Sequence, residues 1–153
     1  MQYRLYQPGD FDELYAIEEI CFTAPERFSR GYMRKLVEST DTATWIAGEP
    51  GSMAGFAIVE WSEQADGVAA YISTIEVLPE WRGKGIGAAL LRHLEESAAG
   101  HEAVALWLHV DAANATAIHL YERSGYRKSG RAEHFYARNR PAAIYVKHLV
   151  REA

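Results

Sequence analysis

Glycines stand at every second position from 83 to 87, directly after an arginine. This segment, Arg-Gly-Lys-Gly-Ile-Gly, follows a β-rich run over residues 69–77 and a short turn that contains Pro79. Apolar residues at helical spacing begin straight after it, so the loop opens an amphipathic helix. A helix N-terminus presents unpaired N–H groups and partial positive charge, and glycine leaves those groups uncovered. The loop therefore predicts a phosphate or pyrophosphate site, formed by Arg82, Gly83, Lys84, Gly85, Ile86, Gly87 and Ala88.

The loop also fits the Gly-x-Gly-x-x-Gly/Ala fingerprint of dinucleotide binding, with Asp111 as the acidic residue downstream. In a dinucleotide-binding fold the glycines follow the strand directly, whereas residues 78–82 intervene here. Too little chain follows the loop for the further parallel strand–helix units of that fold. A nucleotide dehydrogenase is therefore the weaker interpretation of the loop.

Side chains that could move protons lie downstream of the loop. Asn114, Ile118 and Tyr121 are spaced i, i+4 and i+7 and share one face of a short helix. His109 interrupts an apolar run, residues 103–110, where an imidazole without a partner would be costly. The ordinary pKa of a histidine side chain, ~6.5, suits a base near neutral pH, and a tyrosine hydroxyl can act as an acid. Capping by Asn114 and core packing of His109 and Tyr121 are the structural alternatives.

Tyr71 stands on the preceding predicted strand, residues 69–77, at the place that matches that of His109 on residues 103–110. Strict strand alternation would give one face of that strand the odd-numbered residues, Tyr71, Ser73, Ile75 and Val77. Tyr71 could then order a water between an amine and His109, or it could simply pack. Glu76 would point to the opposite face, which makes it a weaker candidate for the base.

Periodicity and turn residues place the remaining elements. Helical spacing of apolar residues predicts helices after Asp10 and Ser29, which can cap them. The expected strands are residues 3–6, 44–47, 54–61, 69–77 and 103–110, one around Tyr126, and 142–148; the later helices are 85–98 and Asn114 to Gly125. This order predicts a mixed α/β sheet, partly antiparallel, in one domain over residues 1–153.

Length and composition limit the class of protein. With 153 residues, 48% hydrophobic and 24% charged, the chain fits one globular domain. No apolar run approaches the ~18 residues of a membrane span and no signal pattern opens the chain, so we expect a cytoplasmic protein without a membrane partner. A net charge of −5 argues against nucleic-acid binding. Cys21 is the only cysteine and the histidines lack metal-ligand spacing, so we expect neither a disulfide nor a metal.

Two motifs at a fixed spacing, residues 82–87 and 114–126, together carry a family resemblance. The first looks like the Gln/Arg-x-x-Gly-x-Gly/Ala loop, and the second like the Asn-x-x-Ala-x-x-Leu-Tyr-x-x-x-Gly-Phe segment, of the GCN5-related N-acetyltransferases. The resemblance covers nearly the whole chain. Within that family the chain is most similar to ribosomal-protein-alanine N-acetyltransferases and to the catalytic subunit of N-terminal acetyltransferase E. It departs from them after Phe22, where Thr23 replaces a proline.

The resemblance implies a fold and a co-substrate. The family fold is a mixed, mostly antiparallel sheet of about seven strands flanked by about four helices. Acetyl-CoA would be the co-substrate, with its pyrophosphate on residues 82–88. The strand end formed by Ile75, Glu76 and Val77 would pair through its backbone with the pantetheine arm, and Asn114 would hold the same arm.

The resemblance also implies residue roles. Tyr121 would hold the cofactor and protonate the departing thiolate, and His109 would accept the amine proton through a water held by Tyr71. An aromatic set would shape the acceptor groove, with core packing as the alternative for each member: Phe22, Phe28, Phe135 and Tyr136.

Several activities stay open at this point. The first is an acetyl-CoA-dependent N-acetyltransferase that acts by direct attack in a ternary complex on a primary amine, either a protein N-terminal α-amine or a lysine. The second is acetylation of a small amine such as a polyamine, an amino acid or a drug. The third is a non-catalytic acyl-CoA sensor, against which the presence of both His109 and Tyr121 argues. A homodimer is a possible assembly.

Overall fold

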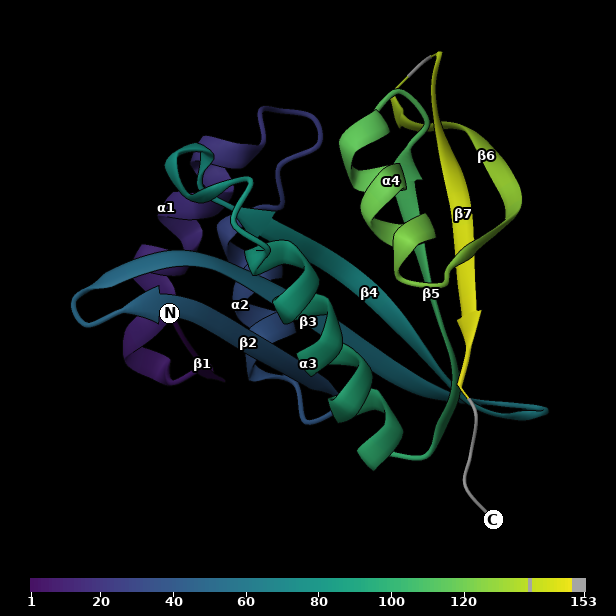
Figure 1. Ribbon diagram of the computed structural model, residues 1–153, viewed down its shortest axis with the longest axis horizontal. Helices are drawn as coiled ribbons and strands as arrows, with labels where there is room; N and C mark the ends of the chain where they lie inside the picture. The colour runs from purple at the N-terminus through teal and green to yellow at the C-terminus, as the bar shows by residue number, and fades with distance from the viewer. Residues whose placement is uncertain (138, 150–153) are drawn as a thin grey trace.

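One seven-stranded sheet, in the order β1-β2-β3-β4-β5-β7-β6, carries the fold of this computed structural model, which describes residues 1–137 and 139–149 (Figure 1). Only the β4–β5 pair is parallel; every other neighbouring pair in the described sheet is antiparallel. The strands are β1 (Gln2–Leu5), β2 (Thr42–Glu49), β3 (Ser52–Gln64), β4 (Gly67–Val77), β5 (Ala103–Asp111), β6 (Arg127–Ala137) and β7 (Arg140–His148).

Two helices cover each face of the sheet (Figure 1). The helices are α1 (Phe11–Cys21), α2 (Arg30–Glu38), α3 (Ile86–Gly100) and α4 (Ala115–Arg123), with short 3₁₀ turns at Pro8–Asp10 and Pro79–Trp81. Apolar side chains of α1 and α2 pack on one face, and those of α3 and α4 pack on the other. Strand β3 is buried on both faces because it lies between the two helical layers. The predicted mixed sheet with seven strands and four helices is thus confirmed.

Three of the four expected helix-end signals are present. Ser29 Oγ accepts the Tyr32 N–H, Asn114 Oδ1 accepts the Ala117 N–H, and Gly125 has a φ of +93° after α4. Asp10 differs from the prediction. Its carboxylate accepts the Gln7 N–H and pairs with Arg4, so it closes the preceding 3₁₀ turn and does not cap α1.

The parallel pair β4 and β5 separates part-way along its length. Its ladder runs only from Val68↔Ala103 to Tyr71↔Trp107, although β4 continues to Val77 and β5 to Asp111. Figure 1 shows the two strands diverging above that point. The sheet therefore opens between its two halves, and the backbone there is free of strand partners on one side.

A bulge at Ser73 corrects the predicted faces of β4. The β3–β4 register passes from Ile58↔Thr74 to Val59↔Ile72, so Ser73 is skipped. Paired residues share a face. Ile75 pairs with Ala57 of the α3 core and therefore lies on the α3 side. Glu76 pairs with Phe56 of the α1/α2 core and lies on that side, as does Tyr71. Strict alternation was wrong because a bulge reverses the side-chain pattern from that residue on.

Candidate active site

A cavity of about 630 Å³ lies where β4 and β5 diverge. Nine of the predicted site residues line it: Tyr71, Ile75, His109, Asn114, Tyr121, Phe22, Phe28, Phe135 and Tyr136. They come from both faces of the sheet, since the gap between the strands connects the two sides. The glycine loop, Glu76 and Val77 are not among the residues that line this cavity. The structure thus brings together the predicted acid, base and acceptor walls, and leaves the predicted pyrophosphate loop beyond them.

Tyr71 and His109 contact each other directly. The Tyr71 hydroxyl lies 2.9 Å from His109 Nδ1. The His109 ring stacks on Phe135, with ring centroids 4.0 Å apart and planes 13° from parallel. The imidazole is therefore fixed by a hydrogen bond at its edge and by an aromatic ring on its face. The predicted water, held by Tyr71 between an amine and His109, stays a prediction.

Burial sets the protonation of this pair. It lowers the pKa of His109 below its ordinary value of 6.5, which leaves the imidazole neutral at pH 7. Burial, with the Glu60 carboxylate as a second cause, raises the pKa of Tyr71 to about 12, so its hydroxyl stays protonated. A neutral imidazole that holds a protonated hydroxyl can accept a proton through that hydroxyl.

Tyr121 lies on the other side of the gap. Its side chain is buried against the α3 core, packs edge-on to Tyr126, and still lines the cavity. Burial raises the pKa of Tyr121 far above its ordinary range, so the hydroxyl is a proton donor at neutral pH. Asn114, at the start of the same helix, also lines the cavity while its Oδ1 caps α4.

The glycine loop has the backbone geometry of an anion site. Gly83 and Gly85 have φ values of +77° and +81°, and a Cβ at either position would meet no atom within 4 Å. Gly85 is the N-cap of α3, whose first N–H groups have no partner within the helix. The side chain of Ile86 is buried, and a Cβ on Gly87 would lie 3.5 Å from Leu120. These two residues can therefore offer only their backbone to a ligand.

Arg82 is turned back toward the strand end. Its Nε donates to the Val77 carbonyl at 2.9 Å, and a second nitrogen lies 3.8 Å from Cys21 Sγ. The Val77 carbonyl is thus already bonded within the chain. Burial, with Glu76 as a further cause, raises the pKa of Cys21 to about 11, so this thiol stays protonated.

The segment between α1 and α2 is anchored beneath the cavity. Tyr15 donates its hydroxyl to the Phe28 carbonyl at 2.8 Å, and Glu18 Oε2 accepts the Phe28 N–H at 3.0 Å. On the other side, Arg140 bridges Glu26 of this segment and Asp111 of β5. These bonds fix the wall that carries Phe28.

A buried pair of carboxyl groups was not predicted from the sequence. Glu18 and Glu76 are 1% and 2% exposed, each has one buried carboxyl oxygen without a hydrogen-bond partner, and Thr74 donates to Glu76. Burial, then the neighbouring Glu18, raises the pKa of Glu76 well above its ordinary value, which favours the protonated form of Glu76. The signal was present, because Glu18 stands at helical spacing between Leu14 and Cys21 on the apolar face of α1.

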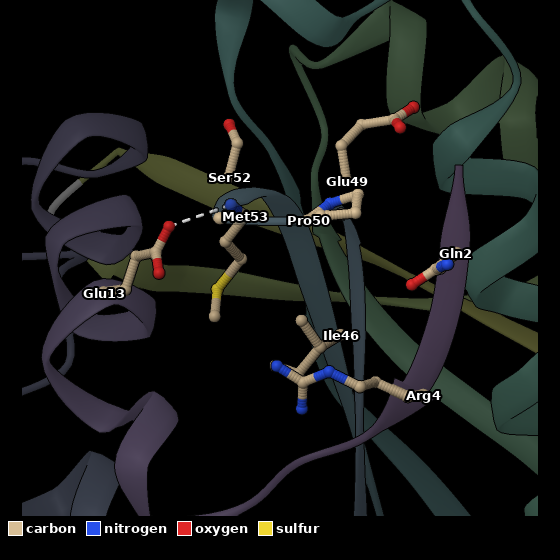
Figure 2. Close-up of a pocket in the computed structure, with 10 residues that line it drawn as sticks. Gln2, Arg4, Glu13, Ile46, Glu49, Pro50, Ser52 and Met53 are labelled. Atoms are coloured by element: carbon tan, nitrogen blue, oxygen red, sulfur yellow. Dashed lines mark hydrogen bonds between the residues drawn. The ribbon is translucent and has the colours of Figure 1, made fainter.

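A smaller cavity elsewhere in the described residues does not offer a competing catalytic site. A cavity of about 210 Å³ lies at the β2–β3 turn, where Figure 2 shows the Glu13 carboxylate bonded to the Met53 N–H. It contains none of the predicted site residues. Within residues 1–137 and 139–149, no group of three or more metal-binding side chains comes together. None of the described helices has the length and apolarity required to cross a bilayer.

Comparison with known proteins identifies the family. Residues 11–126 match the acetyltransferase (GNAT) family model. The chain belongs to the GNAT acetyltransferase family. It is an enzyme of the acetyltransferase class, and acetyl-CoA is the co-substrate of this family. The open glycine loop at the start of α3 fits that co-substrate, since it leaves N–H groups exposed to a pyrophosphate.

Three relatives show which members of the GNAT family this chain resembles. It is 44% identical over 94 residues to streptothricin acetyltransferase of Streptomyces lavendulae, covering 61% of this chain and 49% of that protein. It is 29% identical over 137 residues to a candidate ribosomal protein bS18-alanine N-acetyltransferase of Bacillus subtilis, covering 90% and 87%. It superposes on Arabidopsis thaliana NAA60 in complex with acetyl-CoA with a TM-score of 0.87 at 25% identity, covering 97% and 98%. The predicted resemblance to ribosomal-protein-alanine N-acetyltransferases is confirmed.

Proposed function

We propose that this GNAT domain transfers the acetyl group of acetyl-CoA to a primary amine by direct attack in a ternary complex. The observation that carries the proposal is the Tyr71–His109 hydrogen bond on one side of the β4–β5 gap, with Tyr121 on the other side. The domain covers residues 1–153, and the acceptor is a protein N-terminal α-amine or a lysine. The name of the Bacillus relative, a candidate ribosomal protein bS18-alanine N-acetyltransferase, supports a protein acceptor.

Each step of the transfer has a residue in the cavity. Tyr71 and His109 take a proton from the ammonium, which frees the nitrogen lone pair to attack the thioester carbonyl. The carbon–sulfur bond then breaks, and Tyr121 gives its proton to the coenzyme thiolate. The amide nitrogen releases its second proton, so the whole reaction frees one proton to solvent. Acetyl-CoA would be held by residues 82–88, by Asn114 and by the backbone of Ile75, Glu76 and Val77.

The aromatic residues would form the acceptor groove. Phe22 and Phe28 lie on the α1–α2 segment, and Phe135 and Tyr136 lie on β6, and all four line the same cavity. The amine would enter between these two walls and reach Tyr71 from the α1/α2 side. Its approach is then opposite to that of acetyl-CoA, as direct transfer requires.

A small amine is the second candidate acceptor. The observation that favours it is the 44% identity to streptothricin acetyltransferase, although this chain spans about half the length of that protein. A coenzyme-release assay with acetyl-CoA separates the candidates when it includes peptides with free and blocked N-termini, lysine peptides, and polyamines. Release with peptides that have a free N-terminus and none with blocked ones supports the first acceptor. If no amine causes release of coenzyme A, the result would favour a non-catalytic acyl-CoA sensor.

A further inference from the structure

A second cavity, of about 400 Å³, shares Tyr71 with the cavity that holds His109. Three neighbouring strands contribute to it, because Tyr71 of β4 is paired with Glu60 of β3 and with Trp107 of β5. Directly paired residues share a face of the sheet, so these three side chains all lie on the α1/α2 side. The two cavities are thus neighbours on the side from which the amine would enter.

Glu60 gives this second cavity a negative charge. Its Oε2 accepts the Ser73 hydroxyl at 2.8 Å, and none of the ion pairs among residues 1–137 and 139–149 involves Glu60. Besides burial, its charge raises the pKa values of Tyr71 and Tyr32. The carboxylate is therefore oriented by Ser73, close to two aromatic side chains, and available to a cation.

Trp107 supplies an aromatic face in the same cavity. Its ring centroid lies 4.6 Å from that of Tyr71, with the two rings tilted by 58°, and 5.3 Å from the ring centroid of His109. An aromatic face attracts an ammonium or guanidinium group, most strongly when the ring is tryptophan. Glu60 and Trp107 stand on either side of Tyr71 and both line this cavity, so a cation bound there meets a carboxylate and an aromatic face, whereas an apolar or anionic group gains nothing from the carboxylate.

We propose that this second cavity is a cation subsite, in which Glu60 and Trp107 hold a second positively charged group of the acceptor while its reacting amine lies at Tyr71 and His109. The inference rests on the proposed amine acetylation and narrows the range of acceptors. The preferred acceptor carries two cationic groups, as a diamine does, or as a peptide does when a basic side chain follows its free N-terminus.

Steady-state kinetics with n-pentylamine and cadaverine test the subsite, because these acceptors share a five-carbon chain and differ in the second ammonium. We expect kcat/KM for cadaverine to be roughly tenfold higher, after allowance for its two equivalent amines. Turnover with equal kcat/KM values would exclude a diamine as the source of the second cation, and equal values for the two peptides described below as well would overturn the subsite alone. No turnover with any amine would overturn the proposed acetylation itself.

Two charge-matched variants identify the residue responsible. Glu60→Gln keeps an acceptor for Ser73 and removes the charge, so the preference for cadaverine should collapse. Glu63→Gln removes the same charge from the opposite face of β3, where Glu63 pairs with Val68, and should keep the preference. A preference that survives Glu60→Gln would contradict the proposal. Using the ratio of two acceptors cancels any change in Tyr71 that affects both amines.

A peptide arm shows where the second cation comes from. Ala-Arg-Ala and Ala-Gln-Ala have the same free N-terminus and differ in one guanidinium, which is not itself acetylated. A preference for Ala-Arg-Ala that Glu60→Gln abolishes supports the subsite with a peptide as the source. A preference in the diamine arm alone supports it with a small polyamine as the source, and a preference in neither arm overturns it.

Discussion

His109 is held in one orientation by two different contacts. The Tyr71 hydroxyl fixes its Nδ1, and the Phe135 ring covers its face. Burial keeps the imidazole neutral at pH 7 because its pKa is lowered. An oriented neutral imidazole is prepared to accept a proton without first losing one.

The base is tested by the pH dependence of turnover. His109 acts only when it is unprotonated, so activity should rise with pH through a titration below pH 6.5 and then level off. The variant His109→Ala should lose that acidic limb and most of the rate. Comparing the two enzymes on one acceptor cancels the titration of the amine. A variant with the native rate and profile would place the base elsewhere.

Tyr71 and His109 should act as one unit. Tyr71→Phe removes the hydroxyl that bonds to Nδ1, so it should slow turnover, though less than His109→Ala does. If the proton passes through both groups, the double variant should be clearly less than additive, because either change alone already breaks the relay. Full additivity of the two free-energy changes would mean that the groups act independently.

The role of Tyr121 as the general acid is tested by removing its hydroxyl group. Tyr121→Phe keeps the ring that packs against Tyr126, so folding and acetyl-CoA affinity should persist. Turnover should fall by ~10²–10⁴-fold, which is the usual contribution of a general acid. Tyr126→Phe is a matched control, since its hydroxyl donates to Glu95 and it does not line the cavity. Native turnover in Tyr121→Phe would make this residue a packing aromatic only.

We propose that the loop between β4 and α3 binds the pyrophosphate of the co-substrate. Gly85 sits in the left-handed region, where asparagine and aspartate are tolerated better than other residues. Gly85→Asn and Gly85→Asp therefore strain the backbone alike, and only the second adds a charge that repels a pyrophosphate. Calorimetry should find acetyl-CoA binding roughly tenfold weaker in Gly85→Asp than in Gly85→Asn. Equal affinities would place the pyrophosphate away from this loop.

The contact between α1 and β4 predicts a dependence of stability on pH. The raised pKa of Glu76 means that the folded state binds a proton which the unfolded state has released, so stability falls as pH rises above about 4.5. Glu76→Gln keeps a donor for Glu18 and an acceptor for Thr74. Its melting temperature relative to the native chain should therefore increase from pH 5 to pH 8. A constant difference across that range would argue against a raised pKa of Glu76.

Sequence periodicity predicted most of these elements because they are local. The helix caps at Ser29 and Asn114 and the glycine loop follow from neighbouring residues, and the structure has them. The faces of β4 could not be predicted, since nothing in Ile72-Ser73-Thr74 marks a bulge. The skipped residue is fixed by a partner on another strand, Glu60, and such a contact has no local signature.

For the whole molecule, the site depends on the separation of two halves of the sheet. The fold class followed from the order of elements, but the gap between β4 and β5 arises from long-range packing that periodicity does not contain. The gap connects the side of the sheet that carries Tyr121 to the side that carries His109. A cytoplasmic location and a homodimer stay predictions from the sequence.

In the proposed ternary complex, acetyl-CoA and the acceptor are bound in this gap at the same time, so no acetyl-enzyme is required. Cys21 lines the cavity and is the one thiol in the chain, yet its raised pKa of about 11 leaves little thiolate at neutral pH. Cys21→Ala should therefore keep native turnover, and initial rates should give intersecting double-reciprocal lines, as sequential binding requires. Parallel lines, or loss of turnover in Cys21→Ala with acetyl-CoA affinity unchanged, would indicate a covalent intermediate on this sulfur. Mass spectrometry of the native enzyme mixed with acetyl-CoA alone completes the test, since direct transfer predicts no added acetyl group on Cys21.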